Sequence, residues 1–183
     1  GVEPNAEQAA RLRAEGFEAV QASAHRLPFA DEEFDVAAFS FTPHHLADWN
    51  AGLSEALRVA RHSVEILDVW YDDTIADQRT ARAFDRWLKT IDRRGGMVHN
   101  DTLSPGALLA PILGRREVTF DYACRRVASP TNIEETLETG REYLAKAGND
   151  PVLAKEFEAI AAAAQRDGMT DEGAILMTIE KRR

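Results

Sequence analysis

Residues 22–48 read ASAHRLPFADEEFDVAAFSFTPHHLAD, and this stretch decides the fold class of the 183-residue chain. Its centre, residues 34–41, is an almost unbroken run of apolar and aromatic residues. Such a run is typical of a parallel strand that is covered on both faces of its sheet. Asp48 is a residue type that caps helices, and apolar residues follow it at helical spacing as far as Ala60. A buried strand followed by an amphipathic helix predicts an α/β protein.

Helical and strand patterns alternate on both sides of this stretch. We therefore expect one domain over residues 1–183 with a helical insertion at about residues 74–114, and an antiparallel edge made by the last two strands. The expected elements are a helix at 5–15, strands at 17–22, 34–41 and 64–69, helices at 74–94 and 104–113, a strand at 117–127, a helix opened by a Thr131–Glu134 capping box, a helix after Asp150, and a strand at 174–180.

The composition argues against nucleic acids and membranes as partners of this protein. The formal net charge is −9, and the basic residues are scattered among acidic ones, so we expect no nucleic-acid partner. No apolar run approaches the roughly 20 residues that span a bilayer, so we expect no membrane segment. The single cysteine, Cys124, excludes an internal disulfide framework and fits a reducing compartment. A cytoplasmic protein with a small-molecule partner is the expectation.

Three pieces near the N-terminus occur in a characteristic order. They are GVEP at residues 1–4, the stretch 22–48, and EALRVAR at residues 55–61 followed by SVEILDV at residues 63–69. In this order they resemble class I S-adenosylmethionine (SAM)-dependent methyltransferases, most closely the ubiquinone/menaquinone-biosynthesis type, over about the first 70 residues. The resemblance implies a Rossmann-like methyltransferase sheet with flanking helices, SAM as cofactor, and methyl transfer to a small molecule.

The resemblance also implies cofactor-binding positions at the ends of the strands. Glu3 matches a carboxylate that accepts hydrogen bonds from a ribose diol, although a helix N-terminus also favours an exposed acid. The turn that contacts adenine corresponds to Ser23, Ala24 and His25, with Ser23 in place of the usual acid, and His25 is alternatively an exposed loop histidine. Ser40 and Phe41 would face the methionine part of SAM, with the Phe41 ring beside the sulfonium, or would pack in the core.

The loops that follow two strands supply the expected substrate side. His45 would accept a proton from the substrate, and His44 would line the substrate pocket; both are alternatively loop histidines bonded to backbone. Trp70 and Tyr71 would line the same pocket, or would instead attach the helical insertion to the sheet. Adjacent histidines point in different directions and no metal-ligand spacing is present, so we expect no metal site.

One part of the family pattern is missing. The glycine-rich turn after the first strand has no counterpart, because the sequence begins at Gly1-Val2-Glu3, and Arg61-His62-Ser63 replaces a GG turn. Losing a central strand would expose strand edges and an apolar face. We expect a truncated or former methyltransferase, a homodimer that covers the gap, or a rearranged non-catalytic binding protein that does not bind SAM. A nicotinamide-dependent oxidoreductase fits less well, because its dinucleotide fingerprint is absent.

Overall fold

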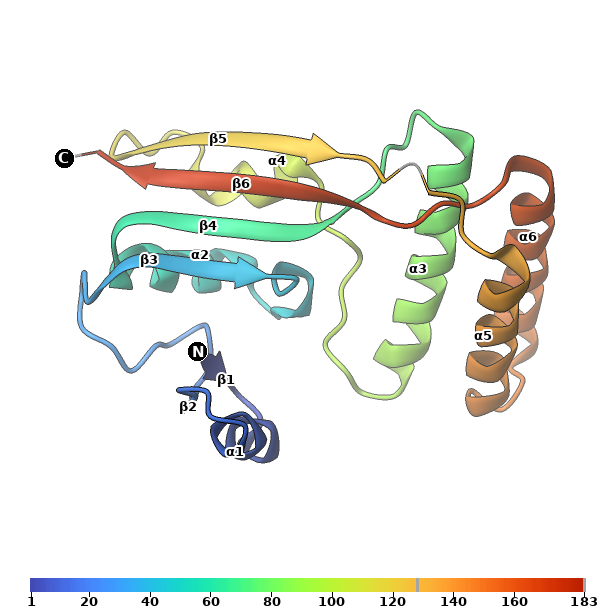
Figure 1. Cartoon of the computed structure of the whole chain (residues 1–183), viewed down its shortest axis with the longest axis horizontal. Helices are drawn as coiled ribbons and strands as arrows, with labels where there is room; N and C mark the ends of the chain where they lie inside the picture. Colours follow the sequence, from blue (N-terminus) through green and yellow to red (C-terminus); the bar gives the residue numbers. More distant parts are fainter. Residues whose placement is uncertain (128, 183) are drawn as a thin grey trace. The chain divides into compact units, whose positions relative to one another are not determined.

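A computed structural model describes residues 1–127 and 129–182 as a mixed α/β protein, in which a sheet is flanked by helices as predicted (Figure 1). The elements are β1 (Val2–Glu3), α1 (Ala6–Ala14), β2 (Val20–Gln21), β3 (Phe34–Ser40), the 3-10 turn η1 (Pro43–His45), α2 (Trp49–Val59), β4 (Ala60–Trp70), α3 (Ala76–Arg94), α4 (Pro105–Leu109), the 3-10 turn η2 (Ala110–Ile112), β5 (Val118–Arg125), α5 (Ile133–Lys146), α6 (Pro151–Asp167) and β6 (Gly173–Lys181).

The chain divides into two compact units. The first unit contains Gly1–Leu67, Pro105–Tyr122 and the residues from Met177 on; the second contains Asp68–Ser104 and Ala123–Leu176. The expectation of one domain with an insertion at residues 74–114 stays a prediction. In the part of the chain that the structure describes, every helix is too short or too polar to cross a membrane.

The strands form two sheets. β1 and β2 pair in parallel as a small two-stranded sheet, and the four-stranded sheet has the order β3-β4-β6-β5. β3 and β4 are parallel, whereas β5 and β6 point in opposite directions, as expected for the last two strands (Figure 1).

The prediction that residues 34–41 form a strand covered on both faces is wrong. β3 is an end strand, and the side chains of Val36 and Phe34 are 48% and 38% exposed to solvent. The physical reason is that side chains alternate between the two faces of a strand. Phe34 and Val36 lie on the face opposite Phe39, and it is Phe39 that packs against α2. The expected exposure of a strand edge and an apolar face is confirmed.

Helix α2 covers β3 within the first unit. Asp48 caps the helix as predicted, its Oδ1 accepting from the Ala51 N–H at 3.1 Å. Leu53 and Ala56 are almost completely buried on the predicted apolar face. The Trp49 ring meets Phe39 edge-on at 5.1 Å between centroids. This packing fixes the C-terminal half of β3 against α2.

The second unit is held together by the packing of α3, α5 and α6. The Trp87 ring stacks on Phe157 at 5.0 Å between centroids, and its Nε1 donates to the Leu153 carbonyl at 3.0 Å. A Cβ at Gly140 would lie 2.3 Å from Phe157 Cε2, so glycine permits α5 to approach α6 closely. Glycine is therefore required here for space rather than for backbone freedom.

The start of α5 differs from the expected capping box. Asn132, not Thr131, is the N-cap, and its Oδ1 accepts from the Glu135 N–H at 3.3 Å. The Thr131 hydroxyl instead donates to Asp171 Oδ1 at 3.4 Å. The box is wrong by one position because asparagine competes for the same role and caps helices at least as well as threonine.

Candidate cofactor site

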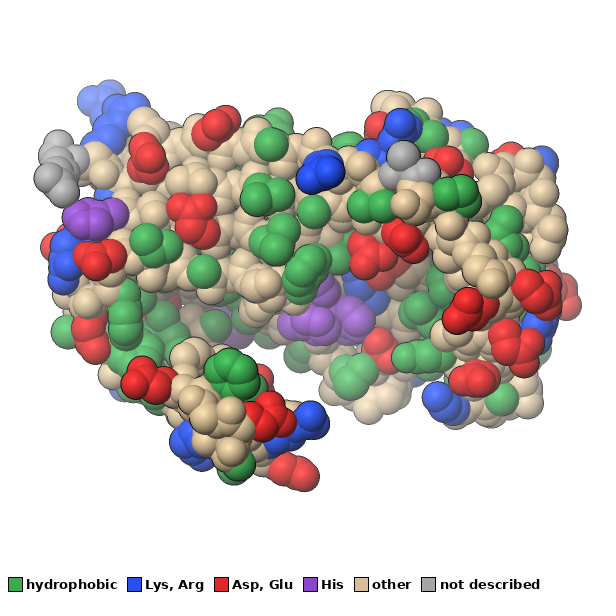
Figure 2. Space-filling model, viewed as in Figure 1, with side chains coloured by type: hydrophobic (Ala, Val, Ile, Leu, Met, Phe, Trp, Pro, Cys, Tyr) green, Lys and Arg blue, Asp and Glu red, His purple; other side chains and the backbone are tan. Residues whose placement is uncertain are grey.

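The first unit contains a cavity of about 530 Å³ between the two-stranded sheet and β3. Figure 2 shows hydrophobic side chains exposed on the surface in the region of β3 and above α1. Among the described residues that line the cavity, the charged ones are Glu18 and Glu33. The walls are formed by Gly1, Val2, Glu18, Val20, Ala24, Leu27, Phe29, Glu33, Phe34, Ala37, Ala38, Phe39, Thr42, Ala56 and Val59. The cavity is thus largely apolar, with an acidic contribution.

Two charged residues of α2 hold one wall of this cavity in place. Arg58 donates from Nη1 to the Phe29 carbonyl at 2.8 Å and from Nη2 to the Leu27 carbonyl at 3.1 Å. Glu55 accepts from the Leu27 N–H at 2.7 Å and from Arg58 Nε at 2.8 Å. Asp31 is a further partner of Arg58, at 2.9 Å. We call Glu55 and Arg58 the loop clamp, because together they satisfy the backbone of the loop before β3.

The ion pair of the loop clamp shifts the pKa values of both of its residues. The hydrogen bond from Arg58 lowers the pKa of Glu55 to about 2; burial opposes this shift, and the bond from the Leu27 backbone adds to it. The carboxylates of Glu55 and Asp31 raise the pKa of Arg58 in turn. Both groups therefore stay ionised at neutral pH, and the loop that carries Leu27 and Phe29 is fixed by charge-assisted hydrogen bonds.

The predicted adenine turn is a tight, internally bonded turn. The Arg26 N–H donates to the Ser23 carbonyl at 3.0 Å, and the Ser23 hydroxyl lies 3.1 Å from His25 Nδ1. His25 Nε2 accepts from the Asp48 N–H at 3.2 Å. A neutral His25 ring therefore carries its proton on Nδ1 and donates it to Ser23. Ala24 lies between these two residues and lines the cavity.

Glu3 lies at the end of β1, where the resemblance requires a carboxylate. Its Oε1 accepts from the Asn5 N–H at 2.8 Å, while Asn5 caps α1 by accepting from the N–H groups of Glu7 and Gln8. The Glu3 carboxylate therefore has one oxygen committed to the start of α1. Glu3 does not itself line the cavity, although Val2 and Gly1 do.

The end of β3 has an unusual backbone. Ser40 is exposed, and its carbonyl accepts from the Thr42 hydroxyl at 2.8 Å. Phe41 has φ 49°, in the left-handed region that residues with a side chain rarely occupy, and it is 46% exposed. Such strained positions cluster at functional sites. Phe41 is therefore not packed in the core, which was the alternative to a cofactor role.

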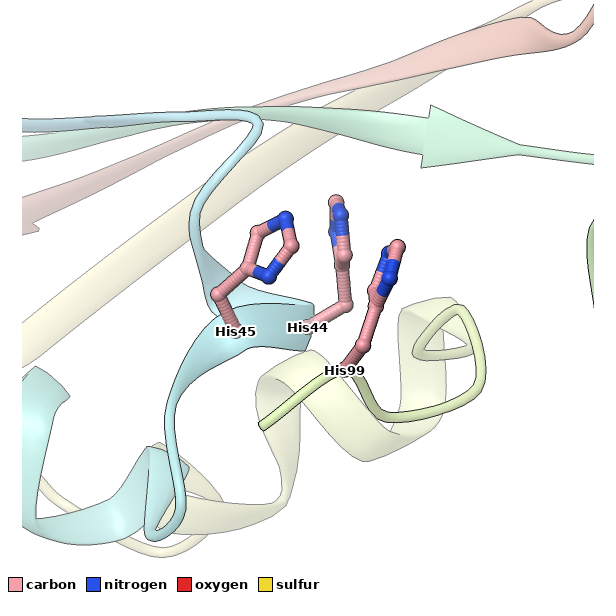
Figure 3. Close-up of side chains that lie close together, drawn as sticks. All are labelled: His44, His45 and His99. Atoms are coloured by element: carbon pink, nitrogen blue, oxygen red, sulfur yellow. The ribbon is translucent and has the colours of Figure 1, made fainter. Parts of the chain in front are cut away.

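The two adjacent histidines occupy η1, directly after β3 (Figure 3). Their ring centroids are 4.4 Å apart; His44 is 5% exposed, whereas His45 is exposed. The third histidine labelled in Figure 3, His99, belongs to the second unit and follows α3. Its Nδ1 lies 2.7 Å from Asp92 Oδ2. Sequence reasoning did not single out His99.

Trp70 and Tyr71, the predicted substrate residues, belong to the second unit. Trp70 ends β4 and is partly buried, whereas Tyr71 is 9% exposed and joins the core of α3, α5 and α6. Among the predicted site residues, the structure brings Ser23 and His25 into contact and places Ala24 on the cavity wall. Their roles stay predictions.

Sequence reasoning missed most of the cavity wall and the loop clamp. Leu27 and Phe29 line the cavity although the sequence assigns them no site role, and Ala37 and Ala38 line it although the sequence predicts a covered strand there. An observable signal existed for the clamp, because Glu55 and Arg58 lie three positions apart on the polar side of α2. Nothing in the local pattern indicated that their partner is a loop about 30 residues earlier.

Comparison with known proteins is consistent with this geometry. Residues 1–67 match a family model described as a methyltransferase domain. The YcgJ protein of Bacillus subtilis superposes with a TM-score of 0.63 at 17% identity, covering 100% of this chain and 82% of that one. The chain shares the α/β fold of solved methyltransferase structures.

Two further solved structures support the same fold. A SAM-dependent methyltransferase of Thermotoga maritima, described as a possible histamine N-methyltransferase, has a TM-score of 0.57 at 16% identity, covering 100% of this chain and 72% of that one. Geranyl diphosphate methyltransferase in complex with SAM has a TM-score of 0.52 at 15% identity, covering 100% and 68%. No protein of curated function matches the chain.

Proposed function

We propose that the first unit binds SAM in the cavity beside β3 and that the protein transfers the SAM methyl group to a small molecule. One observation carries this proposal: every residue that lines the cavity falls within residues 1–59, inside the segment that matches the methyltransferase model. The resemblance to the ubiquinone/menaquinone-biosynthesis type is the finer part of the proposal, and it rests on the N-terminal motifs alone.

The residues that line the cavity suit this ligand. A volume of about 530 Å³ is in the range of small-molecule sites, roughly 300–1,000 Å³. In open α/β sheets, ligands lie beyond the carboxyl ends of the strands. Glu3, Ser23 and Phe41 lie at such strand ends, although none of the three lines the cavity itself. The acidic lining residues Glu18 and Glu33 favour a ligand that carries positive charge. SAM supplies an electrophilic methyl on a sulfonium.

The chain's own residues would bind and orient the two reactants. The uncommitted oxygen of Glu3 would accept from the ribose hydroxyls, and Ala24 would lie against the adenine plane. The Phe41 ring would face the sulfonium. Alignment of the acceptor with the methyl supplies much of the acceleration in such a reaction. His45 would take the proton that the acceptor loses, since it is exposed and histidine is a common general base.

Calorimetric titration with S-adenosylhomocysteine tests this proposal. We expect saturable binding with a micromolar dissociation constant. Ala38→Trp fills the cavity from β3 and should weaken binding by at least about tenfold. Ala10→Trp, which adds the same side chain to the exposed face of α1, should leave binding unchanged. Absence of binding to the unsubstituted chain, or equal binding by both variants, would contradict the proposal.

A second candidate is a non-catalytic interaction protein, which the free edge of β3 favours. Val36 and Phe34 are exposed on an end strand, and such edges pair readily with another chain. The proposed partner is a second copy, whose β3 would pair across a two-fold axis. Sedimentation velocity should then show a concentration-dependent dimer that Val36→Lys disrupts. A monomer at all concentrations would exclude this candidate.

A further inference from the structure

The second unit contains a smaller cavity of about 220 Å³, separate from the proposed cofactor site. Its walls come from four places. They are Tyr71 after β4, α3 with Phe84 and Asp85, the start of α5 with Thr131 and Thr136, and the segment 169–172 before β6. The space equals the liquid volume of about seven water molecules, which is enough for a small organic molecule. Aromatic, apolar and acidic groups therefore surround one small space.

Tyr71 is a buried polar residue whose hydroxyl is available to a ligand. It is 9% exposed and lines the cavity. Burial, and then the charges of Asp85 and Glu172, raise the pKa of Tyr71 well above its usual value. The hydroxyl is therefore neutral at physiological pH and can both donate and accept. A neutral hydroxyl on the wall of a cavity can hydrogen-bond to a polar ligand that enters it.

The charge of the cavity is negative. Among the described residues that line it, the charged ones are the three carboxylates of Asp85, Asp171 and Glu172. Buried Lys89 donates to Asp85 Oδ2 at 2.8 Å and balances that carboxylate. Arg82 lies nearby but forms an ion pair with Asp73. Two negative charges, those of Asp171 and Glu172, are therefore left in excess at this cavity.

The walls fit an organic cation better than a metal ion. In the described part of the chain, no three of these carboxylates come close enough together to share a metal ion. Phe84 and Met169 instead provide an apolar surface, and aromatic faces attract ammonium groups. An ammonium group has only donors, which match the Tyr71 oxygen and the carboxylates.

We propose that this cavity binds a small organic ammonium ion, with the charged group toward Glu172 and Tyr71 and an apolar arm against Phe84 and Met169. The site goes beyond the proposed methyl transfer, and its occupation does not depend on SAM. Its ligand is defined by chemistry: one positive charge with an aromatic or aliphatic arm of a few carbons.

Methyl NMR on the full chain, labelled with 13C at the methionine methyl groups, tests this site. The protein has three methionines, and Met169 lines the cavity, whereas Met177 is 1% exposed and Met97 is 54% exposed. Benzylamine should shift the Met169 signal in a saturable manner and leave the Met97 signal in place. Benzyl alcohol has the same shape without the charge and should bind at least about tenfold more weakly.

Two substitutions separate recognition from general effects. Glu172→Gln keeps the shape and should weaken benzylamine about fivefold, and Tyr71→Phe should also weaken it. Glu158→Gln removes an exposed carboxylate on α6, away from the cavity, and should have no effect. The site is refuted if benzyl alcohol binds as well as benzylamine, if Met169 does not respond, or if Glu158→Gln weakens binding as much as Glu172→Gln.

Discussion

Replacing Glu55 by glutamine tests the loop clamp that holds one wall of the proposed cofactor cavity. Glutamine keeps an oxygen that can accept from the Leu27 N–H but removes the negative charge that pairs with Arg58. The pKa of Glu55 is lowered from an ordinary value of 4.5 to about 2, mainly by Arg58. In free energy this is at most ~3 kcal/mol at neutral pH. Because the Arg58 side chain is 31% exposed, we expect a loss of ~1–2 kcal/mol.

The effect of Glu55→Gln should depend on pH in a defined direction. The folded-state pKa lies below the unfolded one, so the contribution is fully present above pH 4.5 and is lost as the pH falls toward 2. Urea unfolding followed by tryptophan fluorescence, from about pH 7 to about pH 3, measures this. The difference between the two proteins should shrink across the acidic part of the range.

The control for this experiment is Glu158→Gln, which removes an exposed carboxylate on α6 and should change stability by less than about 0.5 kcal/mol. A Glu55→Gln protein as stable as the unsubstituted one at pH 7, or a stability difference that stays constant down to about pH 3, would refute the reasoning.

Two further predictions concern Gly140 and the left-handed backbone at Phe41. Gly140→Ala should lower the free energy of unfolding by ~1–2 kcal/mol, because overpacking against Phe157 outweighs the gain in helix propensity. Urea unfolding measures this, with the exposed Thr139→Ala as the control, and a stabilised Gly140→Ala protein would contradict the prediction. Phe41→Gly should be about 1 kcal/mol more stable than Phe41→Ala, because only glycine relieves the positive φ. Equal melting temperatures of the two Phe41 variants would show that this backbone is not strained.

Local signals predicted most of the secondary structure. The cap at Asp48 and the apolar spacing of Leu53 and Ala56 are properties of neighbouring residues, and the structure confirms α2 from them. The Asp150 cap of α6 is confirmed in the same way. The burial of β3 was not predictable, because an apolar run shows that a strand needs cover but not whether a neighbour is present. Val36 is exposed for this reason.

The site was predictable only in part, because its contacts are long-range. The resemblance directed attention to the turn at Ser23 and His25, and the structure shows that these residues bond to each other and to Asp48. The loop clamp joins Arg58 to the carbonyl groups of Leu27 and Phe29, and no local pattern encodes that pairing. The second-unit cavity likewise gathers residues from segments up to about 100 positions apart, from Tyr71 to Glu172, which a sequence pattern does not show.

A crystal structure of the chain grown with saturating S-adenosylhomocysteine tests the central claim most directly. We predict that the ligand lies in the first-unit cavity, in contact with Ala24, Ala38 and Thr42. An empty cavity at saturating ligand, or a ligand bound elsewhere on the chain, would contradict the claim.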